Sequence, residues 1–141
     1  MEYHGYGVNF SRLKVSEHKF VMWLKKTHQG YGCKFEARLH EYNNDFDKTI
    51  SQFNTLVKGS QNGLISLIIF ICEKVDNIRF DYVMSDEGDE YLLLCKRSPW
   101  EYNDCERNLT RELLKNYFLK HLSEFTNVEP QDIDDMVVYI E

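Results

Sequence analysis

The stretch Ile78–Phe125 constrains the fold most, because it predicts two strands followed directly by an amphipathic helix. Every second residue from Ile78 to Met84 is apolar, which is typical of a strand with one buried face. Tyr91–Cys95 is a short continuous apolar run, the length of a strand that is covered on both faces, although periodicity alone does not exclude a helical segment. The segment 85–90 between them has no apolar residue and contains a glycine. We therefore predict an antiparallel hairpin over about 78–96.

A helix is predicted to follow the hairpin, over about 110–125. Thr110 is suited to cap its N-terminus, because the hydroxyl can accept a hydrogen bond from an amide of the first turn. Apolar residues then recur at helical spacing and give the helix one broad face for packing against the sheet. A β-branched run, Met136–Ile140, predicts a final strand over about 135–140. The predicted helix face consists of Leu113, Leu114, Tyr117, Phe118, His121, Leu122 and Phe125.

The first half of the chain is predicted to be mainly helical. Ser16 is a suitable cap for a helix whose apolar stripe begins at Phe20, and Gly30 is expected to end that helix in a left-handed conformation. Before this helix, residues 1–10 combine two glycines with aromatic side chains. We expect an extended arm or an edge strand there.

Two further apolar patterns lie in the middle of the chain. From Phe35 to Val57 apolar residues are three or four positions apart, and Asn43–Asp45 is expected to divide this helical segment into two helices. Asp45 is expected to cap the second helix, which ends at Gly59. A short strand over 33–39 stays open as an alternative to the start of the first helix. The twelve residues Leu64–Val75 favour a buried helix, although their β-branched content also suits a strand.

Together these elements predict a single α+β domain over residues 1–141. We expect helices first, then a small, mainly antiparallel sheet with one helix packed across it. A chain of 141 residues, 43% of them apolar, can bury a core without disulfides or a structural metal. No internal repeat or low-complexity tract is visible.

The formal charge of −6 is unevenly distributed along the chain. Residues 1–84 contain 11 basic and 9 acidic residues, whereas residues 85–141 contain 6 basic and 14 acidic residues. Because neutralising phosphates requires lysine and arginine, this balance disfavours a protein that binds nucleic acid directly. The acidic C-terminal part instead suits a basic protein partner.

The four cysteines fall at spacings that match no zinc or redox motif. Cys72 and Cys95 sit in apolar runs, so we expect buried free thiols, as in a cytoplasmic protein. No basic and apolar leader opens the sequence, and the longest apolar run, Leu64–Cys72, is too short to cross a bilayer. We therefore expect a cytoplasmic location and no membrane partner.

No catalytic, cofactor or metal motif emerges from the sequence. The histidines form no H-x-x-x-H pair, and His121 lies on the apolar stripe of its predicted helix, where a hydrogen-bonded core histidine is favoured over a catalytic base. The loop 85–90 lacks the alternating ligands of a calcium-binding EF-hand. We therefore expect a protein that is not an enzyme and needs neither cofactor nor metal.

Carboxylates close to aromatic residues form the predicted partner-binding set. Aromatic side chains supply contact area, and carboxylates steer and orient a basic partner. The set combines the hairpin loop, the segment after the hairpin and the approach to the last strand. Its members are Asp86, Glu87, Asp89, Glu90, Trp100, Glu101, Tyr102, Asp104, Asp132, Asp134 and Asp135.

In its small size, acidity and lack of motifs, the chain resembles in general character the anti-CRISPR proteins of phages and mobile elements and the toxin immunity proteins. The resemblance implies an inhibitor that occupies the basic surface of a nuclease or another nucleic-acid-binding effector. Two alternatives stay open. One is a small enzyme whose cysteine, histidine and carboxylate groups meet only in space, and the other is an oligomeric accessory subunit.

Overall fold

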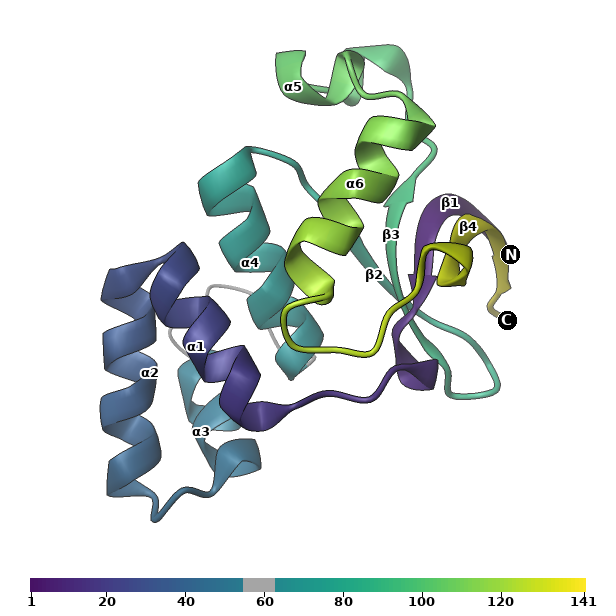
Figure 1. Ribbon diagram of the computed structural model, residues 1–141. Coiled ribbons are helices and arrows are strands. Elements are labelled where there is room, and N and C mark those ends of the chain that lie inside the picture. Colours follow the sequence, from purple (N-terminus) through teal and green to yellow (C-terminus); the bar gives the residue numbers. More distant parts are fainter. Residues whose placement is uncertain (55–62) are drawn as a thin grey trace.

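The sheet is built from segments at both ends of the chain. The computed structural model describes residues 1–54 and 63–141, and its four-stranded antiparallel sheet has the order β2-β3-β1-β4. The strands are β1 (Glu2–Asn9), β2 (Asp81–Met84), β3 (Glu90–Cys95) and β4 (Ile133–Tyr139). With its helices this sheet forms one α+β domain, which confirms the predicted fold class (Figure 1).

Helix α6 (Arg111–Leu122) lies between the sheet and a group of four other helices (Figure 1). Its N-terminus is where the sequence predicts it, since the Thr110 hydroxyl accepts a hydrogen bond from the Leu113 N–H at 3.2 Å. A separate short helix, α5 (Asp104–Arg107), precedes it. The group of four consists of α1 (Glu17–Thr27), α2 (Gln29–Glu41), α3 (Phe46–Asn54) and α4 (Leu64–Asp76).

Several predicted helix boundaries are confirmed. The Ser16 hydroxyl caps α1 by accepting from the Lys19 N–H at 3.3 Å, and an Asp45 carboxylate oxygen caps α3 by accepting from the Lys48 N–H at 3.1 Å. The turn between α2 and α3 uses two residues with positive φ, Asn43 and Asn44. Residues 33–39 and 64–75 are helical, which decides both open alternatives in favour of the helix. The predicted helix end at 57–59 lies outside the described residues.

The prediction that Gly30 ends the first helix was wrong. His28 separates α1 from α2: its N–H donates to the Leu24 carbonyl oxygen at 2.8 Å, and its ring Nδ1 accepts from the Tyr31 N–H at 3.2 Å. Gly30 therefore lies in the first turn of α2. In α2 it is Gly32 that allows close packing, because an added Cβ there would lie 2.4 Å from the Cα of Lys25 on α1.

The expectation of an arm or an edge strand at residues 1–10 was also wrong, because β1 is an interior strand of the sheet. It pairs with β3 on one side and with β4 on the other. Neighbouring elements approach this strand closely at Gly7, where an added Cβ would lie 2.1 Å from the Leu92 carbonyl oxygen and 3.0 Å from Cζ of Phe118. Because Gly7 has no apolar side chain, its burial is not visible in the sequence, and β1 lacks the apolar alternation that is typical of a strand.

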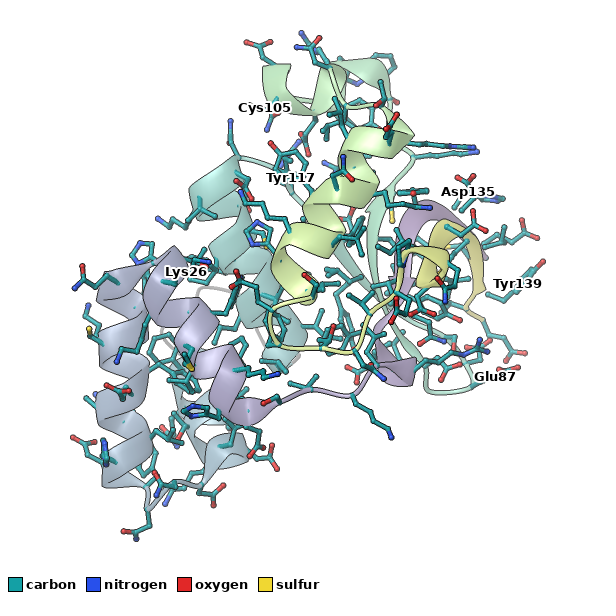
Figure 2. The ribbon with its side chains drawn as sticks, viewed as in Figure 1. Lys26, Glu87, Cys105, Tyr117, Asp135 and Tyr139 are labelled. Carbon is teal, nitrogen blue, oxygen red and sulfur yellow. The ribbon has the colours of Figure 1, made fainter. Side chains whose placement is uncertain are left out.

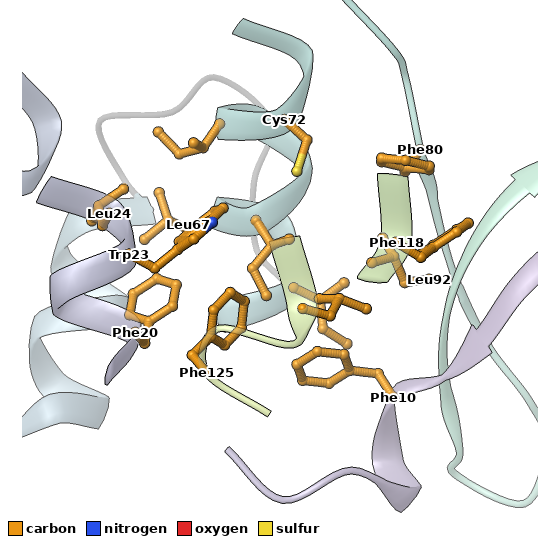
Figure 3. Packing of buried hydrophobic residues seen from close by; sticks show 14 of the residues in the cluster. Phe10, Phe20, Trp23, Leu24, Leu67, Cys72, Phe80, Leu92, Phe118 and Phe125 are labelled. Carbon is orange, nitrogen blue, oxygen red and sulfur yellow. The ribbon is translucent and has the colours of Figure 1, made fainter. Parts of the chain in front are cut away.

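The main core fills the space between α6, the sheet and the other helices (Figure 3). Phe125, which follows α6, packs on α1, since its ring centroid lies 5.3 Å from that of Phe20 and 4.9 Å from that of Trp23. Phe118 of α6 packs on Phe80 at 4.8 Å between ring centroids. All these side chains are buried, so α6 is fixed to both the helices and the sheet.

A smaller cluster covers the opposite face of the sheet and contains Val83, Leu93 and Val138. Leu92 points into the main core and Leu93 into this cluster, so β3 is buried on both faces, as predicted. Val83 was expected on an exposed face, and that was wrong because this second cluster covers it. The prediction that Leu113 lies on the buried face of its helix was also wrong, since Leu113 is 48% exposed at the margin of α6.

Candidate partner-binding surface

The hairpin loop between β2 and β3 folds against the end of β4. The Asp86 N–H donates to the Tyr139 carbonyl oxygen at 3.3 Å, and the Asp86 carboxylate accepts from the Glu141 N–H at 3.1 and 3.0 Å. On the neighbouring strand the Met1 ammonium donates to the Ile140 carbonyl oxygen at 2.8 Å. The loop and the two terminal strands therefore meet on one side of the molecule (Figure 1).

A hollow of about 180 Å³ lies between the loop and β4. Acidic residues lie on its loop side, and aromatic and aliphatic residues of β3 and β4 border the rest. We call this hollow and its margin the hairpin–β4 surface. It consists of Ser85, Asp86, Glu87, Tyr91, Val137, Val138 and Tyr139.

The hairpin–β4 surface presents apolar groups and a carboxylate to solvent side by side. Tyr139 is 63% exposed and Val137 is 44% exposed, although both are large apolar residues. Glu87 is exposed and makes no hydrogen bond or ion pair with any residue that the structure describes. Figure 2 shows Glu87 and Tyr139 on the same side of the molecule. This combination of exposed apolar area and an unpaired charge suits a docking surface.

The other hairpin carboxylates differ in their surroundings. Glu90 accepts a hydrogen bond from the Tyr82 hydroxyl at 2.7 Å, and its own N–H donates to the Ser11 hydroxyl at 2.8 Å. Burial and the neighbouring Glu90 carboxylate raise the pKa of Tyr82 to about 12. Asp89 and Ser85 close the loop, since the Asp89 N–H donates to the Ser85 hydroxyl and the Ser85 N–H donates to the Asp89 carbonyl oxygen. Glu90 therefore contributes to the hairpin itself, and Asp86 and Glu87 face β4.

The predicted carboxylates of β4 and its approach lie at the other end of that strand and are largely engaged within the chain. Asp132 accepts from the Glu129 N–H at 2.8 Å, and Asp134 accepts from the Asp135 N–H at 2.8 Å. Asp135 forms an ion pair of 2.7 Å with Arg111 of α6. In Figure 2 Asp135 lies on the same side of the view as Tyr139. These residues add negative charge beside the surface without lining its hollow.

The segment that follows β3 is remote from the hairpin loop. It leads into α5, which carries Cys105 at the end of the molecule away from Glu87 in Figure 2. Trp100 is 79% exposed there, whereas Tyr102 donates its hydroxyl to the Cys95 carbonyl oxygen at 3.3 Å. The predicted residues Glu101 and Asp104 have partners within this segment: the Ser98 N–H at 2.9 Å and Arg107 at 3.6 Å. The predicted set is thus divided, and Trp100 does not join the hairpin–β4 surface.

A buried ionic cluster explains why this segment is held in place. Glu106 is 4% exposed and accepts from the backbone N–H groups of Arg79 and Asn103, each at 3.1 Å. The guanidinium groups of Arg79 and Arg97 lie 3.4 and 3.6 Å from its carboxylate. Burial alone would raise the pKa of Glu106, but these hydrogen bonds and charges outweigh it and lower the pKa. The cluster has a structural role, because it holds α5 against Arg79, in the segment that leads into β2.

The most enzyme-like group of residues surrounds His121. Its Nδ1 accepts from the Trp23 indole N–H at 3.3 Å, and its Nε2 lies 2.5 Å from a carboxylate oxygen of Asp76. Because Nδ1 accepts from the indole, Nε2 is the nitrogen that carries the proton and donates it to Asp76. Trp23, Asp76 and His121 border an open cavity of about 370 Å³. With both ring nitrogens engaged, His121 has no free lone pair for general-base catalysis, which supports a core histidine.

Sequence reasoning missed Ser85 of the hairpin–β4 surface and its four apolar residues, Tyr91, Val137, Val138 and Tyr139. Their apolar character assigned them to the core of predicted strands. The available signal was the alternation of β4: Ile133, Asp135, Val137 and Tyr139 share one direction, and the acidic member of that row indicates partial exposure. The contact between the loop and Tyr139 depends on tertiary structure, and no local pattern encodes it.

No helix among the described residues has the length and apolar character needed to cross a membrane. In the same part of the chain, no three His, Cys, Asp or Glu side chains come together in a way that could hold a metal ion. Comparison with protein-family models, with curated proteins and with solved structures finds no match to this chain.

Proposed function

We propose that this chain is a non-enzymatic binding protein whose hairpin–β4 surface docks a basic protein. The observation that carries the proposal is the unpaired Glu87 carboxylate next to the exposed side chains of Val137 and Tyr139. Exposed aromatic and aliphatic groups supply binding energy once water is excluded, and the carboxylate favours a cationic partner. The charge of −6 supports the same class of partner.

The partner class that fits best is a protein with a basic surface, such as a nuclease or a nucleic-acid-binding effector. Such a protein concentrates lysine and arginine where it holds phosphates. A small acidic domain seated there would compete with nucleic acid and act as an inhibitor. Because charge steers the encounter, the association rate is expected to fall as salt rises.

The first experiment captures the partner and then tests the charge. Tagged protein is used to recover bound proteins from the native host, and the recovered partner is purified for calorimetric titration with the wild type, Glu87→Lys and Glu112→Lys. Glu112 is an exposed carboxylate on α6 and serves as the matched control. We expect 1:1 binding to a basic protein. Glu87→Lys should weaken this binding about tenfold or more, which corresponds to about 1.4 kcal/mol. Glu112→Lys should leave the affinity nearly unchanged.

Equal affinities for the wild type and Glu87→Lys would contradict the proposal, since the unpaired carboxylate would then lie outside the interface. An acidic partner would contradict it as well. A competition assay with a nucleic acid ligand of the recovered partner adds the functional readout. The wild type should displace the ligand, and Glu87→Lys should do so only at higher concentration.

A further inference from the structure

We infer that the hydrogen bond between Trp23 and His121 is a pH-sensitive connection between α1 and α6, which protonation of His121 breaks. We call this hydrogen bond the Trp23–His121 contact. It lies on the helical side of the molecule, so the inference does not depend on the proposed function. His121 is 5% exposed and Trp23 is 2% exposed, which places the contact inside the core.

One ring nitrogen of His121 determines whether the contact exists. Nδ1 accepts from the Trp23 indole N–H at 3.3 Å, so it must keep its lone pair. When a proton from solvent binds Nδ1, the lone pair is used and both ring nitrogens become donors. The indole is only a donor, so it then faces an N–H group and loses its acceptor. Protonation of Nδ1 and the Trp23–His121 contact therefore exclude each other.

Asp76 of α4 allows His121 to take up this proton inside the core. Its carboxylate lies 2.5 Å from Nε2 and stays opposite the imidazolium, so the buried positive charge has a counter-charge. The Asp76 carboxylate also forms an ion pair with Lys120 of α6 at 3.5 Å, and that pair is unaffected by the state of Nδ1. Protonated His121 is thus expected to keep its bond to α4 and to lose its bond to α1.

The remaining titratable groups near His121 do not alter this balance. Lys26 of α1 pairs with Glu124 at 2.8 Å, so these two charges offset each other. On α4, burial raises the pKa of the Cys72 thiol to about 12, so Cys72 is uncharged at neutral and acidic pH. Histidine is the residue type in this group that ordinarily changes charge between about pH 5 and about pH 8.

An open cavity gives solvent access to the contact. It has a volume of about 370 Å³, and Trp23, Asp76 and His121 all border it. A proton can therefore reach the imidazole without unfolding of the chain. The same space can hold a water molecule that accepts from the indole N–H after Nδ1 has been protonated. The cavity thus makes the change local.

Different contacts hold the two ends of α1. At the N-terminal end, the Ser16 N–H donates to the Phe125 carbonyl oxygen at 2.8 Å, and no titratable side chain takes part in this bond. In the second half of the helix, Trp23 reaches His121 of α6. Lower pH is therefore expected to loosen the C-terminal half of α1 against α6 and to leave the N-terminal end attached.

NMR spectroscopy of the intact protein tests the inference by titration from about pH 8 to about pH 5. The ring nitrogen signals of His121 report its protonation, and the indole N–H signal of Trp23 reports the contact. We expect the two to change together, with the Trp23 signal approaching that of an indole in water. Trp100, which is exposed, supplies that reference, and Trp100→Phe assigns the two indole signals. A His121 ring that is protonated without a change at Trp23 would overturn the inference, as would a ring that stays neutral at the lower limit.

Hydrogen exchange tests whether the change is confined to one part of α1. The His28 N–H donates to the Leu24 carbonyl oxygen at the C-terminal end of this helix. Between about pH 8 and about pH 5, its protection factor should fall about tenfold, and that of the Ser16 N–H should change by less than about twofold. Equal losses at His28 and Ser16 would overturn the local connection, because the whole helix would then open.

His121→Gln separates protonation of this ring from other effects of acid. Glutamine keeps one donor and one acceptor at the end of its side chain but does not titrate. The response of the Trp23 indole signal to pH should disappear in this variant and persist in the control His18→Gln, which changes an exposed histidine of α1. A response that persists in His121→Gln would overturn the inference. The wild-type titration decides the question even if this variant fails to fold.

Discussion

The backbone N–H of Asp86 lies 3.3 Å from the carbonyl oxygen of Tyr139, and this contact joins the hairpin loop to the last strand. β2 and β4 are the two outer strands of the sheet, so the contact brings its opposite edges together at one point. The Asp86 carboxylate strengthens the junction by accepting from the Glu141 N–H. The hollow of the hairpin–β4 surface exists because of this junction.

Asp86 and Glu87 are expected to have separable roles. Asp86→Ala removes the acceptor of the Glu141 N–H and should lower the free energy of unfolding by about 1 kcal/mol, the typical contribution of a hydrogen bond. Glu87→Ala should leave the free energy of unfolding within about 0.5 kcal/mol of the wild type, as is usual for exposed positions. It should lower the affinity for the basic partner. Urea denaturation measures the first effect and calorimetric titration the second. A stability loss in Glu87→Ala as large as that in Asp86→Ala would refute this division.

Gly7 and Gly30 provide a matched pair for the packing of β1. Gly7→Ala places a Cβ 2.1 Å from the Leu92 carbonyl oxygen, so strands must shift and the free energy of unfolding should fall by about 3 kcal/mol or more, at the upper end of overpacking effects. Gly30→Ala meets no atom closer than 3.5 Å and should stabilise α2 by up to about 1 kcal/mol. Thermal and urea denaturation of both variants provide the comparison. A Gly7→Ala protein as stable as the wild type would show that β1 does not run so close to Leu92.

Glu106 makes the stability of the fold dependent on pH on the acidic side. Its folded pKa lies below its ordinary value of 4.5, so its stabilising effect is present above that value and is lost as the pH falls through the folded pKa. Glu106→Gln should cost about 3 kcal/mol at pH 7, because the nearby arginines lose their buried counter-charge. It should also flatten the decline of stability below pH 4.5 relative to the wild type. Urea denaturation across the pH range measures both, and the exposed Glu112→Gln serves as control. A parallel decline in Glu106→Gln would assign the acid sensitivity to other carboxylates.

His121 is expected to act through packing and hydrogen bonding. His121→Leu removes the acceptor of the Trp23 indole N–H and the donor to Asp76, so the indole loses its partner and the Asp76 carboxylate keeps only its ion pair with Lys120 at 3.5 Å. The free energy of unfolding should fall by about 2 to 4 kcal/mol, and the Trp23 fluorescence should change in the folded state. His18→Leu, at an exposed position of α1, is the control and should be close to neutral. Unchanged Trp23 emission and stability in His121→Leu would disprove the hydrogen-bonded array.

The sequence by itself determined the local elements of this protein. Helix caps at Ser16, Asp45 and Thr110 act through hydrogen bonds to amides within the next turn, so the residue type is enough to place them. The hairpin also follows from local information, because a polar loop between two apolar runs specifies the reversal. The division of charge between the two halves of the chain is likewise a property of the sequence.

Tertiary structure alone decided the place of β1 and the composition of the candidate surface. At Gly7 the information lies in the absence of a side chain, which becomes meaningful only when Leu92 and Phe118 close around it. The predicted acidic set was divided because Glu87 precedes β3 and Trp100 follows it, at opposite ends of the strand, whereas Tyr139 reaches the loop through the last strand. Periodicity reports which side chains share a face of one element, and it contains no information about which distant elements meet. That depends on long-range pairing and packing, through which the fold placed Asp86 beside Tyr139.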